Sequence, residues 1–349
     1  MKKIYTLILL SVLVIPKLIA QNQNLSSQTA VPFLLIVPDA RSAGMGDLGV
    51  ATSADAYSNF HNSAKLVFLE SKREVSVFFV PWMNNVVKDV FLSGFSYAQK
   101  INERSSFGVN FNYFTLGDVD LTGDDGSYLG QERPSDLNID FQYALKLSET
   151  FSMGVGLGYI RSDLGLNSVD SDIQTINTVA VDVGMFYQSK AVRYQGFDLI
   201  YRAGLSVDNI GPKVQQSEGG EESYLPTNLK LGAGFDFGFD PQNRLTTNLE
   251  ITKLLVPTQV ETDEGSVDED WSGNLAYGLG FEYAFDQAFF LRTGYFYENP
   301  DYGARNYITF GAGFQTNNLS MDVSYLFNQS QVNNALDNTL RISLGYSFD

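Results

Sequence analysis

The stretch Phe151-Ser152-Met153-Gly154-Val155-Gly156-Leu157-Gly158-Tyr159 decides the fold class, because large apolar residues alternate strictly with serine and glycine. A period of two places successive side chains on opposite faces of a β-strand. One face of this strand would be large and apolar, and the other small or polar. The same alternation recurs in residues 107–113, 137–143 and 340–348.

Runs of this kind occur fourteen times after residue 72. They lie near 73–82, 88–100, 105–117, 135–147, 150–161, 175–188, 196–208, 227–238, 243–255, 273–285, 288–297, 305–315, 318–328 and 338–348. Most are ten residues or longer, whereas soluble strands have about five or six and a strand tilted across a bilayer needs about 9–11. No later stretch reaches the roughly 18 apolar residues of a spanning helix. The sequence therefore predicts an all-β fold, a 14-stranded antiparallel transmembrane β-barrel.

The two faces of these strands differ as a membrane barrel requires. The apolar face suits lipid, and the face with Gly, Asn, Ser and Asp suits a narrow lumen. Trp82 and Trp271, at expected outer strand ends, are interpreted as membrane-interface anchors. Charged residues on the inner face could line a pathway, or could pair across the lumen and fill it. They are Asp140, Asp182, Arg202, Lys230, Asp236, Glu282, Arg292, Asp322 and Arg341.

The connections alternate in length, which gives an orientation. Short turns near 101–104, 148–149 and 286–287 alternate with long connections at 118–134, 162–174, 209–226 and 256–272. Bacterial outer-membrane barrels have short periplasmic turns and long outer loops. We therefore expect the outer membrane of a Gram-negative bacterium as the location, with both termini periplasmic.

The composition leaves little for catalysis or nucleic-acid binding. A net charge of −17 argues against a nucleic-acid partner, since phosphate binding needs clustered Lys and Arg. The absence of Cys excludes thiol catalysis and Cys-based zinc sites. One histidine, His61, leaves little room for a His-based metal site or a catalytic triad. We expect no enzyme activity and no cofactor, with His61 as a hydrogen-bonded structural residue.

Residues 1–20 have the pattern of a secretory signal peptide. Lys2 and Lys3 precede an apolar run from Tyr5, and the small residue Ala20 ends the segment. Cleavage before Gln21 would remove three lysines and take the formal net charge from −17 to −20. The expected division is a signal peptide (1–20), an N-terminal plug segment in the lumen or on its periplasmic side (21–72) and the barrel (73–349).

A glycine- and alanine-rich stretch, residues 29–68, precedes the strands. It contains Gly44-Met45-Gly46-Asp47-Leu48-Gly49, which has the spacing of the dinucleotide-binding motif G-x-G-x-x-G. That motif needs a strand ending at its first glycine and a βαβ continuation. Here residues 38–43 intervene, and alternating β segments follow. We interpret the glycines as close-packing positions in a segment that plugs the lumen from the periplasmic side.

Two expected outer loops are strongly acidic. An EF-hand calcium loop in the first would need Asp or Asn in place of Thr122 and Glu in place of Leu129. Solvated surface charge is the expected role, with divalent-cation contact or partner recognition as alternatives. The candidate partner-binding residues are Asp118, Asp120, Asp124, Asp125, Asp263, Glu264 and Trp271.

Several runs between residues 29 and 68 form one specific combination. They are residues 31–36, 38–41, 44–47, 49–52, 55–56 and 62–65. The combination resembles the PorV (LptO-like) family, outer-membrane barrels of the type IX secretion system within the larger fatty-acid-transporter-like (FadL-like) barrels. The candidate motif residues are Pro32, Asp39, Arg41, Gly44, Met45, Gly46, Asp47, Gly49 and Asn62. The family's usual Asn-Pro-Ala reads Asn62-Ser63-Ala64 here.

This resemblance implies a fourteen-stranded barrel whose N-terminal segment lies in or under the lumen, and a role in protein export. The implied partners are the giant translocon barrel (Sov/SprA-like), folded C-terminal signal domains of secreted proteins, and a cell-surface attachment complex with a sortase-like peptidase (PorU-like), in addition to outer-membrane lipids. We expect long outer loops to bind cargo and release it after shuttling. The alternative is a FadL-like transporter of hydrophobic small molecules, which needs an apolar lumen pocket.

Overall fold

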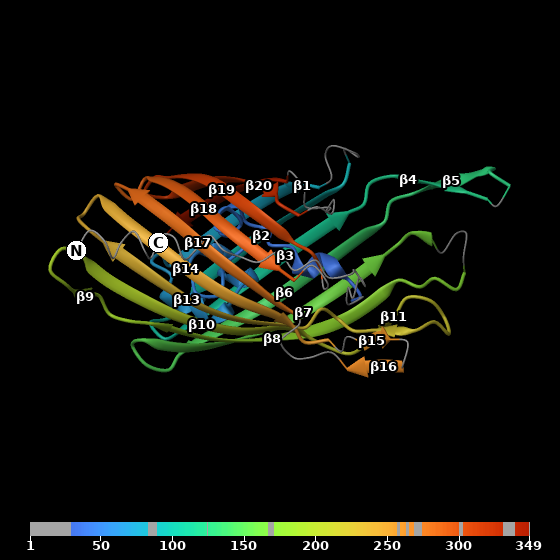
Figure 1. Ribbon diagram of the computed structural model, residues 1–349, viewed down its shortest axis with the longest axis horizontal. Coiled ribbons are helices and arrows are strands. Elements are labelled where there is room, and N and C mark those ends of the chain that lie inside the picture. Colours follow the sequence, from blue (N-terminus) through green and yellow to red (C-terminus); the bar gives the residue numbers. More distant parts are fainter. Residues whose placement is uncertain are drawn as a thin grey trace.

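The computed structural model describes residues 29–82, 89–123, 125–166, 171–256, 259–262, 265–268, 274–299, 303–330 and 339–348. Fourteen strands form one antiparallel barrel (Figure 1). In order around the ring they are β1 (Arg73–Pro81), β2 (Phe91–Lys100), β3 (Ser105–Thr115), β6 (Ser135–Lys146), β7 (Phe151–Asp163), β8 (Ile176–Gln188), β10 (Asp198–Ile210), β13 (Asn228–Gly238), β14 (Asn243–Leu254), β17 (Leu275–Phe285), β18 (Phe289–Glu298), β19 (Asn306–Gln315), β20 (Leu319–Asn328) and β21 (Leu340–Phe348). Pairing of Arg73 in β1 with Phe348 in β21 closes the ring.

The fold prediction is confirmed. Each of the fourteen expected segments is a barrel strand, and their ends differ by at most three residues. In β7 the exposed residues Val155, Leu157 and Tyr159 face outward at 52%, 56% and 42% exposure, while the glycines between them are buried. Alternation therefore separates a lipid-facing surface from a lumen surface as the sequence predicted.

The two ends of the barrel differ in their connections. At one end, here the long-loop end, three connections carry two-stranded sheets of their own. These are β4 (Val119–Thr122) with β5 (Tyr128–Glu132), β11 (Val214–Gln215) with β12 (Glu222–Ser223), and β15 (Gln259–Thr262) with β16 (Gly265–Asp268). At the other end, here the short-turn end, β9 (Val192–Arg193) pairs with the start of β10. The sequence predicted the loops but not these small sheets.

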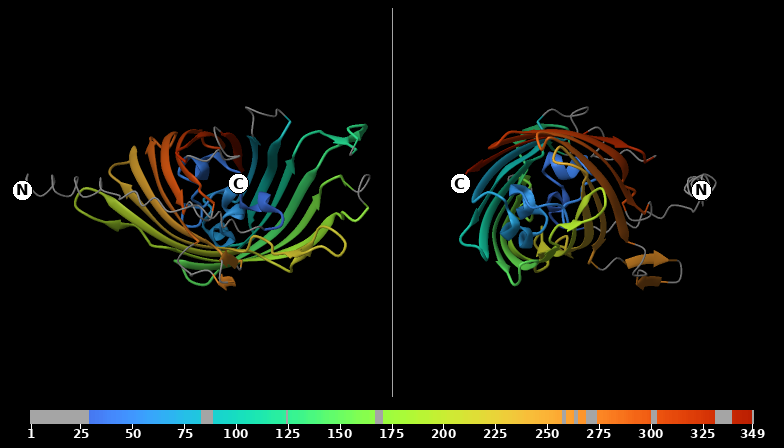
Figure 2. Two further views of the ribbon diagram at one scale, coloured as in Figure 1. Left: turned by 45° about the vertical axis from the view of Figure 1, so that its right-hand side comes forward. Right: turned by 90° about the vertical axis from the view of Figure 1, so that its left-hand side faces the viewer.

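Residues 29–72, here the inner segment, lie within the ring of strands (Figure 2). The segment forms η1 (Pro32–Leu35), α2 (Ala40–Gly44), η2 (Ala56–Phe60) and η3 (Ser63–Phe68). Helix α2 contacts β18–β21, η2 contacts β1–β3, and η3 contacts β2, β3 and β6–β8. Among the described residues no helix is long and apolar enough to cross a bilayer.

The inner segment runs from one end of the barrel to the other. The Ala30 amide donates to the Tyr224 carbonyl, 2.9 Å away, in the long connection after β10. At the opposite end, the Lys146 ammonium lies 4.7 Å from the centre of the Phe68 ring. The sequence predicted a segment in the lumen or on its periplasmic side. Its apolar start lies at the long-loop end, because Phe33 needs an apolar surface and Phe114 provides one at a ring distance of 6.2 Å.

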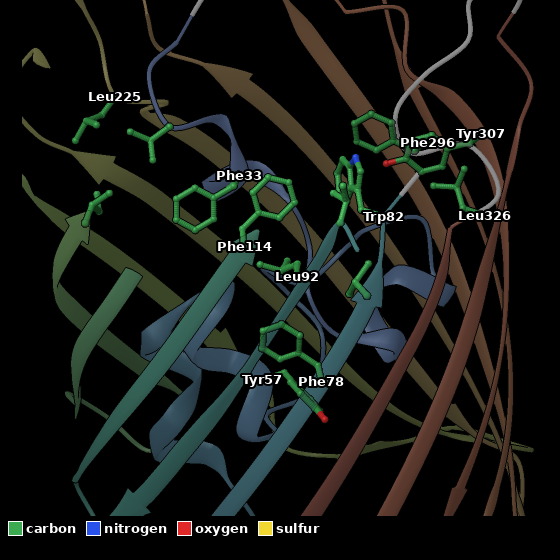
Figure 3. Close-up of a cluster of buried hydrophobic side chains, with 14 of the residues drawn as sticks. Phe33, Tyr57, Phe78, Trp82, Leu92, Phe114, Leu225, Phe296, Tyr307 and Leu326 are labelled. Atoms are coloured by element: carbon green, nitrogen blue, oxygen red, sulfur yellow. The ribbon is translucent and has the colours of Figure 1, made fainter. Parts of the chain in front are cut away.

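Aromatic side chains fill the lumen at the long-loop end (Figure 3). Trp82 packs on Phe114 at 5.8 Å, and Phe296 stacks on Tyr307 at 4.9 Å. Trp82 is only 9% exposed, so its interpretation as a membrane-interface anchor is wrong. Residue 82 has the same parity as the inward-facing Phe78, which turns its ring into this cluster. Trp271 lies outside the described residues.

Candidate functional site

The family-motif residues form the contact between the inner segment and the barrel wall. At the start of α2, Asp39 accepts a hydrogen bond from the Ser42 amide and lies 2.7 Å from His61 Nε2. Both side chains are buried. Burial alone would raise the pKa of Asp39, but His61 and Ser42 outweigh it and lower this pKa below its ordinary value. His61 is thus a structural, hydrogen-bonded histidine.

Arg41 joins the inner segment to a network of charges on the barrel wall. Its guanidinium donates to both oxygens of Glu282 at 3.1 Å, and to Asp55 at 2.7 Å. Glu282 also accepts from Arg292 Nε at 2.6 Å, and Arg292 reaches Asp322 at 2.6 Å. The inward charges of this network therefore pair and fill the lumen, which decides between the two alternatives for them.

Residues 44–47 lie flat against β18 and β19. Gly46 has φ +83°, a backbone conformation that favours glycine, and its amide donates to Thr309 Oγ1 at 2.9 Å. Met45 is fully buried. Asp47 accepts hydrogen bonds from Tyr307 and from Arg341. A Cβ on Gly44 would lie 3.1 Å from the Gly311 Cα, so the two backbones touch.

The last two motif residues hold the middle of the inner segment. The Gly49 amide donates to Glu250 Oε2 at 3.0 Å, and a Cβ on Gly49 would lie 2.1 Å from the His61 ring. Asn62 Nδ2 donates to the Met185 carbonyl at 3.0 Å, and Asn62 Oδ1 caps η3 by accepting from the Ala64 amide. Pro32, in contrast, is an exposed residue at the start of η1.

One residue of this contact was not among the candidate site residues predicted from the sequence. Lys65 is fully buried, and its ammonium donates to the Gly49 carbonyl at 2.9 Å and to Thr52 Oγ1 at 2.8 Å. Burial lowers the pKa of Lys65 to about 8. A single charge inside the run Ser63–Phe68, otherwise apolar after its first residue, was the available signal.

The acidic loop candidates lie elsewhere, on the outside of the long-loop end. Asp118 pairs with Arg133 at 2.7 Å, and Asp120 accepts from Gln131 at 3.2 Å. Asp125 accepts from Ser127 within its own turn. All three carboxylates are exposed. Asp124, Asp263, Glu264 and Trp271 lie outside the described residues. The described loop candidates and the motif residues thus occupy two separate regions.

The family model for PorV, described as type IX secretion system protein PorV, matches residues 19–261. The chain belongs to the PorV family. No curated protein matches it. PorV-family membership and the closed barrel together fit an outer-membrane location.

Solved structures share the fold of this PorV-family chain at low sequence identity. The toluene transporter TbuX of Ralstonia pickettii aligns with a TM-score of 0.54 and 12% identity, over 89% of this chain and 98% of that one. The Pseudomonas putida toluene transporter TodX aligns with a TM-score of 0.54 and 10% identity, over 94% of this chain and 99% of that one. The CymD monoaromatic hydrocarbon channel aligns with a TM-score of 0.51 and 15% identity, over 90% of this chain and 98% of that one. These likenesses show the barrel fold alone and say nothing of what this chain binds or carries.

Proposed function

We propose that this chain receives folded C-terminal signal domains of secreted proteins at the giant translocon barrel (Sov/SprA-like) and carries them to the attachment complex (PorU-like). The observation that carries the proposal is the PorV match over residues 19–261, which supports an outer-membrane component of the type IX secretion system. In this proposal the chain catalyses no reaction and needs no cofactor. Reversible handover favours moderate affinity, because a shuttle must release what it binds.

The β4–β5 hairpin is the proposed recognition surface. It extends from the long-loop end well beyond the barrel wall (Figure 1). Its apolar side chains Tyr128 and Leu129 are 66% and 54% exposed. Exposed apolar residues rimmed by polar ones are typical of protein interaction sites, and here Asp118 and Asp120 provide the rim. These features support binding of a folded protein domain at the hairpin.

The inner segment is proposed to act as a plug. The ion pairs of Arg41 and Arg202, and the aromatic cluster around Phe114, leave the lumen largely filled with protein. A filled lumen favours passage of cargo along the loops and not through the barrel. In the same proposal the long-loop end faces the cell exterior, both mature termini are periplasmic, and residues 1–20 are a cleaved signal peptide.

Deletion of a long connection tests the loop proposal. Replacing residues 118–134 or 256–272 with a short turn should leave the barrel in the outer membrane, shown by heat-modifiable mobility in gels. Co-purification of secreted proteins with the solubilised barrel should be lost. Unchanged co-purification from both deletions would contradict loop recognition.

A point-variant pair gives the matched control. Tyr128→Ser with Leu129→Ser removes the apolar tip of the β4–β5 hairpin. Val192→Ser with Tyr194→Ser removes side chains of 39% and 50% exposure at the short-turn end. We expect the first pair to reduce cargo co-purification and the second to leave it unchanged. Equal effects would show that the hairpin is not the recognition surface.

Transport of hydrophobic small molecules is the alternative function, and the likeness to TbuX and TodX favours it through the fold alone. One lumen cavity beside the inner segment measures about 100 Å³; its barrel wall is polar, with Asn110, Asp140 and Asp182, whereas its inner-segment wall is apolar from Leu34 to Pro38. The carboxylates on the barrel wall disfavour an apolar guest. Partner pull-down separates the functions: a giant barrel with secreted proteins supports the shuttle, and bound hydrocarbon or lipid alone supports the transporter.

A further inference from the structure

Five polar side chains on neighbouring strands form a group inside the lumen, here the oxygen basin: Asn110, Asn138, Asp140, Gln142 and Asp182. Asn110 and Asn138 each donate Nδ2 to Asp140 Oδ2, at 2.6 and 2.7 Å. Gln142 donates Nε2 to Asp182 Oδ2 at 3.2 Å. Each amide nitrogen donates a hydrogen bond to a carboxylate, so the oxygen of the same amide group points away from that carboxylate.

These amide oxygens lack partners. The side-chain oxygens of Asn110, Asn138 and Gln142 are buried and accept no hydrogen bond within the part of the chain that the structure describes. The three side chains are only 1%, 5% and 4% exposed. Buried acceptors usually bind a donor or a cation, so these three oxygens are available as ligands for one.

The two carboxylates of the basin also lack a positive partner. Among the described residues, neither Asp140 nor Asp182 forms an ion pair within 4.0 Å. The Lys and Arg side chains on this cavity's wall pair with other carboxylates: the Lys230 ammonium lies 3.0 Å from Asp208, and Arg305 lies 2.8 Å from Glu298. Asp140 and Asp182 therefore place two negative charges without an ion pair on the wall of a cavity of about 100 Å³. Two buried negative charges require compensation.

Glycines on β7 allow these oxygens to gather. Strand β7 lies between β6 and β8, with Gly156 opposite both Gln142 and Asp182. A Cβ on Gly156 would lie 2.4 Å from Gln142 Oε1, and one on Gly158 would lie 2.2 Å from Asp140 Oδ1. The long side chains can therefore lie over the backbone of β7 and approach one another.

We propose that the oxygen basin binds one divalent cation of the calcium type. Calcium takes six to eight oxygen ligands, among them carboxylates, Asn and Gln carbonyls and waters, in flexible geometry. A cluster of three or more His, Cys, Asp or Glu side chains that could hold a metal ion by themselves does not occur among the described residues. The two carboxylates Asp140 and Asp182 would therefore need the amide oxygens and water as further ligands. Its two positive charges match the two negative charges of Asp140 and Asp182.

Calcium binding to the full-length chain in a non-chelating detergent tests the proposal. Isothermal titration with CaCl₂ should give one ion per chain, and calcium should raise the melting temperature. Asp140→Asn with Asp182→Asn should weaken binding at least tenfold and abolish the shift in melting temperature. Gln142→Leu, which leaves both carboxylates in place, is the second variant and should weaken binding by a smaller factor.

The acidic loop provides the matched control. Asp118→Asn with Asp120→Asn removes two exposed carboxylates of the long-loop end and should leave calcium affinity unchanged. Absence of binding to the wild-type chain would mean that the basin holds only water or protons, and this would overturn the proposal. Loss of binding in the loop variant with retention in the basin variants would also overturn it, because the ion would then belong to the loop.

Discussion

Replacement of Gly294 by alanine directly tests the contact between the inner segment and the barrel. Gly294 lies on β18, and a Cβ there would lie 2.0 Å from the Met45 carbonyl carbon and 2.1 Å from the Gly46 nitrogen. An ordinary contact begins near 3.4 Å, so the inner segment must move by about 1.4 Å. Such a movement would weaken the hydrogen bond from Gly46 to Thr309.

The expected cost of Gly294→Ala is the sum of two effects. Overpacking costs about 1–3 kcal/mol, and an unsatisfied buried hydrogen-bonding group about 1–3 kcal/mol, so the free energy of unfolding should fall by about 2–6 kcal/mol. Urea titration in lipid vesicles measures it. The inner segment should also become sensitive to protease between residues 40 and 60.

A second glycine gives the control for this experiment. A Cβ on Gly238 would lie 3.8 Å from the nearest atom, the Asp198 carbonyl oxygen, which is an ordinary contact distance. The free energy of unfolding of the Gly238→Ala variant should therefore lie within about 1 kcal/mol of the wild-type value, because alanine changes mainly the entropy of the unfolded chain. If both alanine variants unfold alike and resist protease alike, the close backbone contact at Met45 is wrong.

Three further changes test other contacts. Burial lowers the pKa of Lys65 from 10.5 to about 8, so between these pH values the unfolded chain holds a proton that the folded chain has lost. The free energy of unfolding should then rise with pH by about 3 kcal/mol, and Lys65→Met should abolish the rise in urea titrations; parallel profiles would contradict this. Arg202→Met should cost about 3–5 kcal/mol by leaving Asp236 buried and unpaired, whereas Arg202→Met with Asp236→Leu should recover most of it; equal losses would count against a charge effect. In a Trp271→Phe variant, Trp82 should resist quenching by brominated lipids, and strong quenching would place it at the membrane interface.

The barrel could be predicted from the sequence because each strand carries its own signal. Where one face is glycine and the other large, as in β7, the period of two assigns both faces without any tertiary information. In strand β1 this assignment of the two faces from residue size fails. Phe78 faces the lumen and Phe79 faces outward, so residue size does not separate the faces there. The direction of Trp82 depended on the aromatic cluster at the long-loop end, which the inner segment completes.

The candidate site could be predicted as a segment but not as a set of contacts. Asp39 and His61 are 22 residues apart, and Arg41 meets Glu282 at a separation of 241. Such pairs depend on how the inner segment is threaded through the finished barrel, and no local pattern specifies this path. Lys65 was missed for the same reason, since its two acceptors are provided by residues 49 and 52 after folding.

The contacts of the motif explain why its residues belong to the lumen and not to a ligand site. Gly44 lies against Gly311, Gly46 against Tyr295, and the Met45 backbone against Gly294, so at each place the absence of a side chain allows backbone-to-backbone approach. Asp39 and Arg41 form their hydrogen bonds with groups of the same chain. When polar groups are already hydrogen-bonded within the chain, few donors and acceptors remain for a partner molecule. In the proposed function, cargo recognition therefore belongs to parts of the chain with exposed apolar and charged groups, namely the loops of the long-loop end, and the packed interior would hold those loops on a rigid frame.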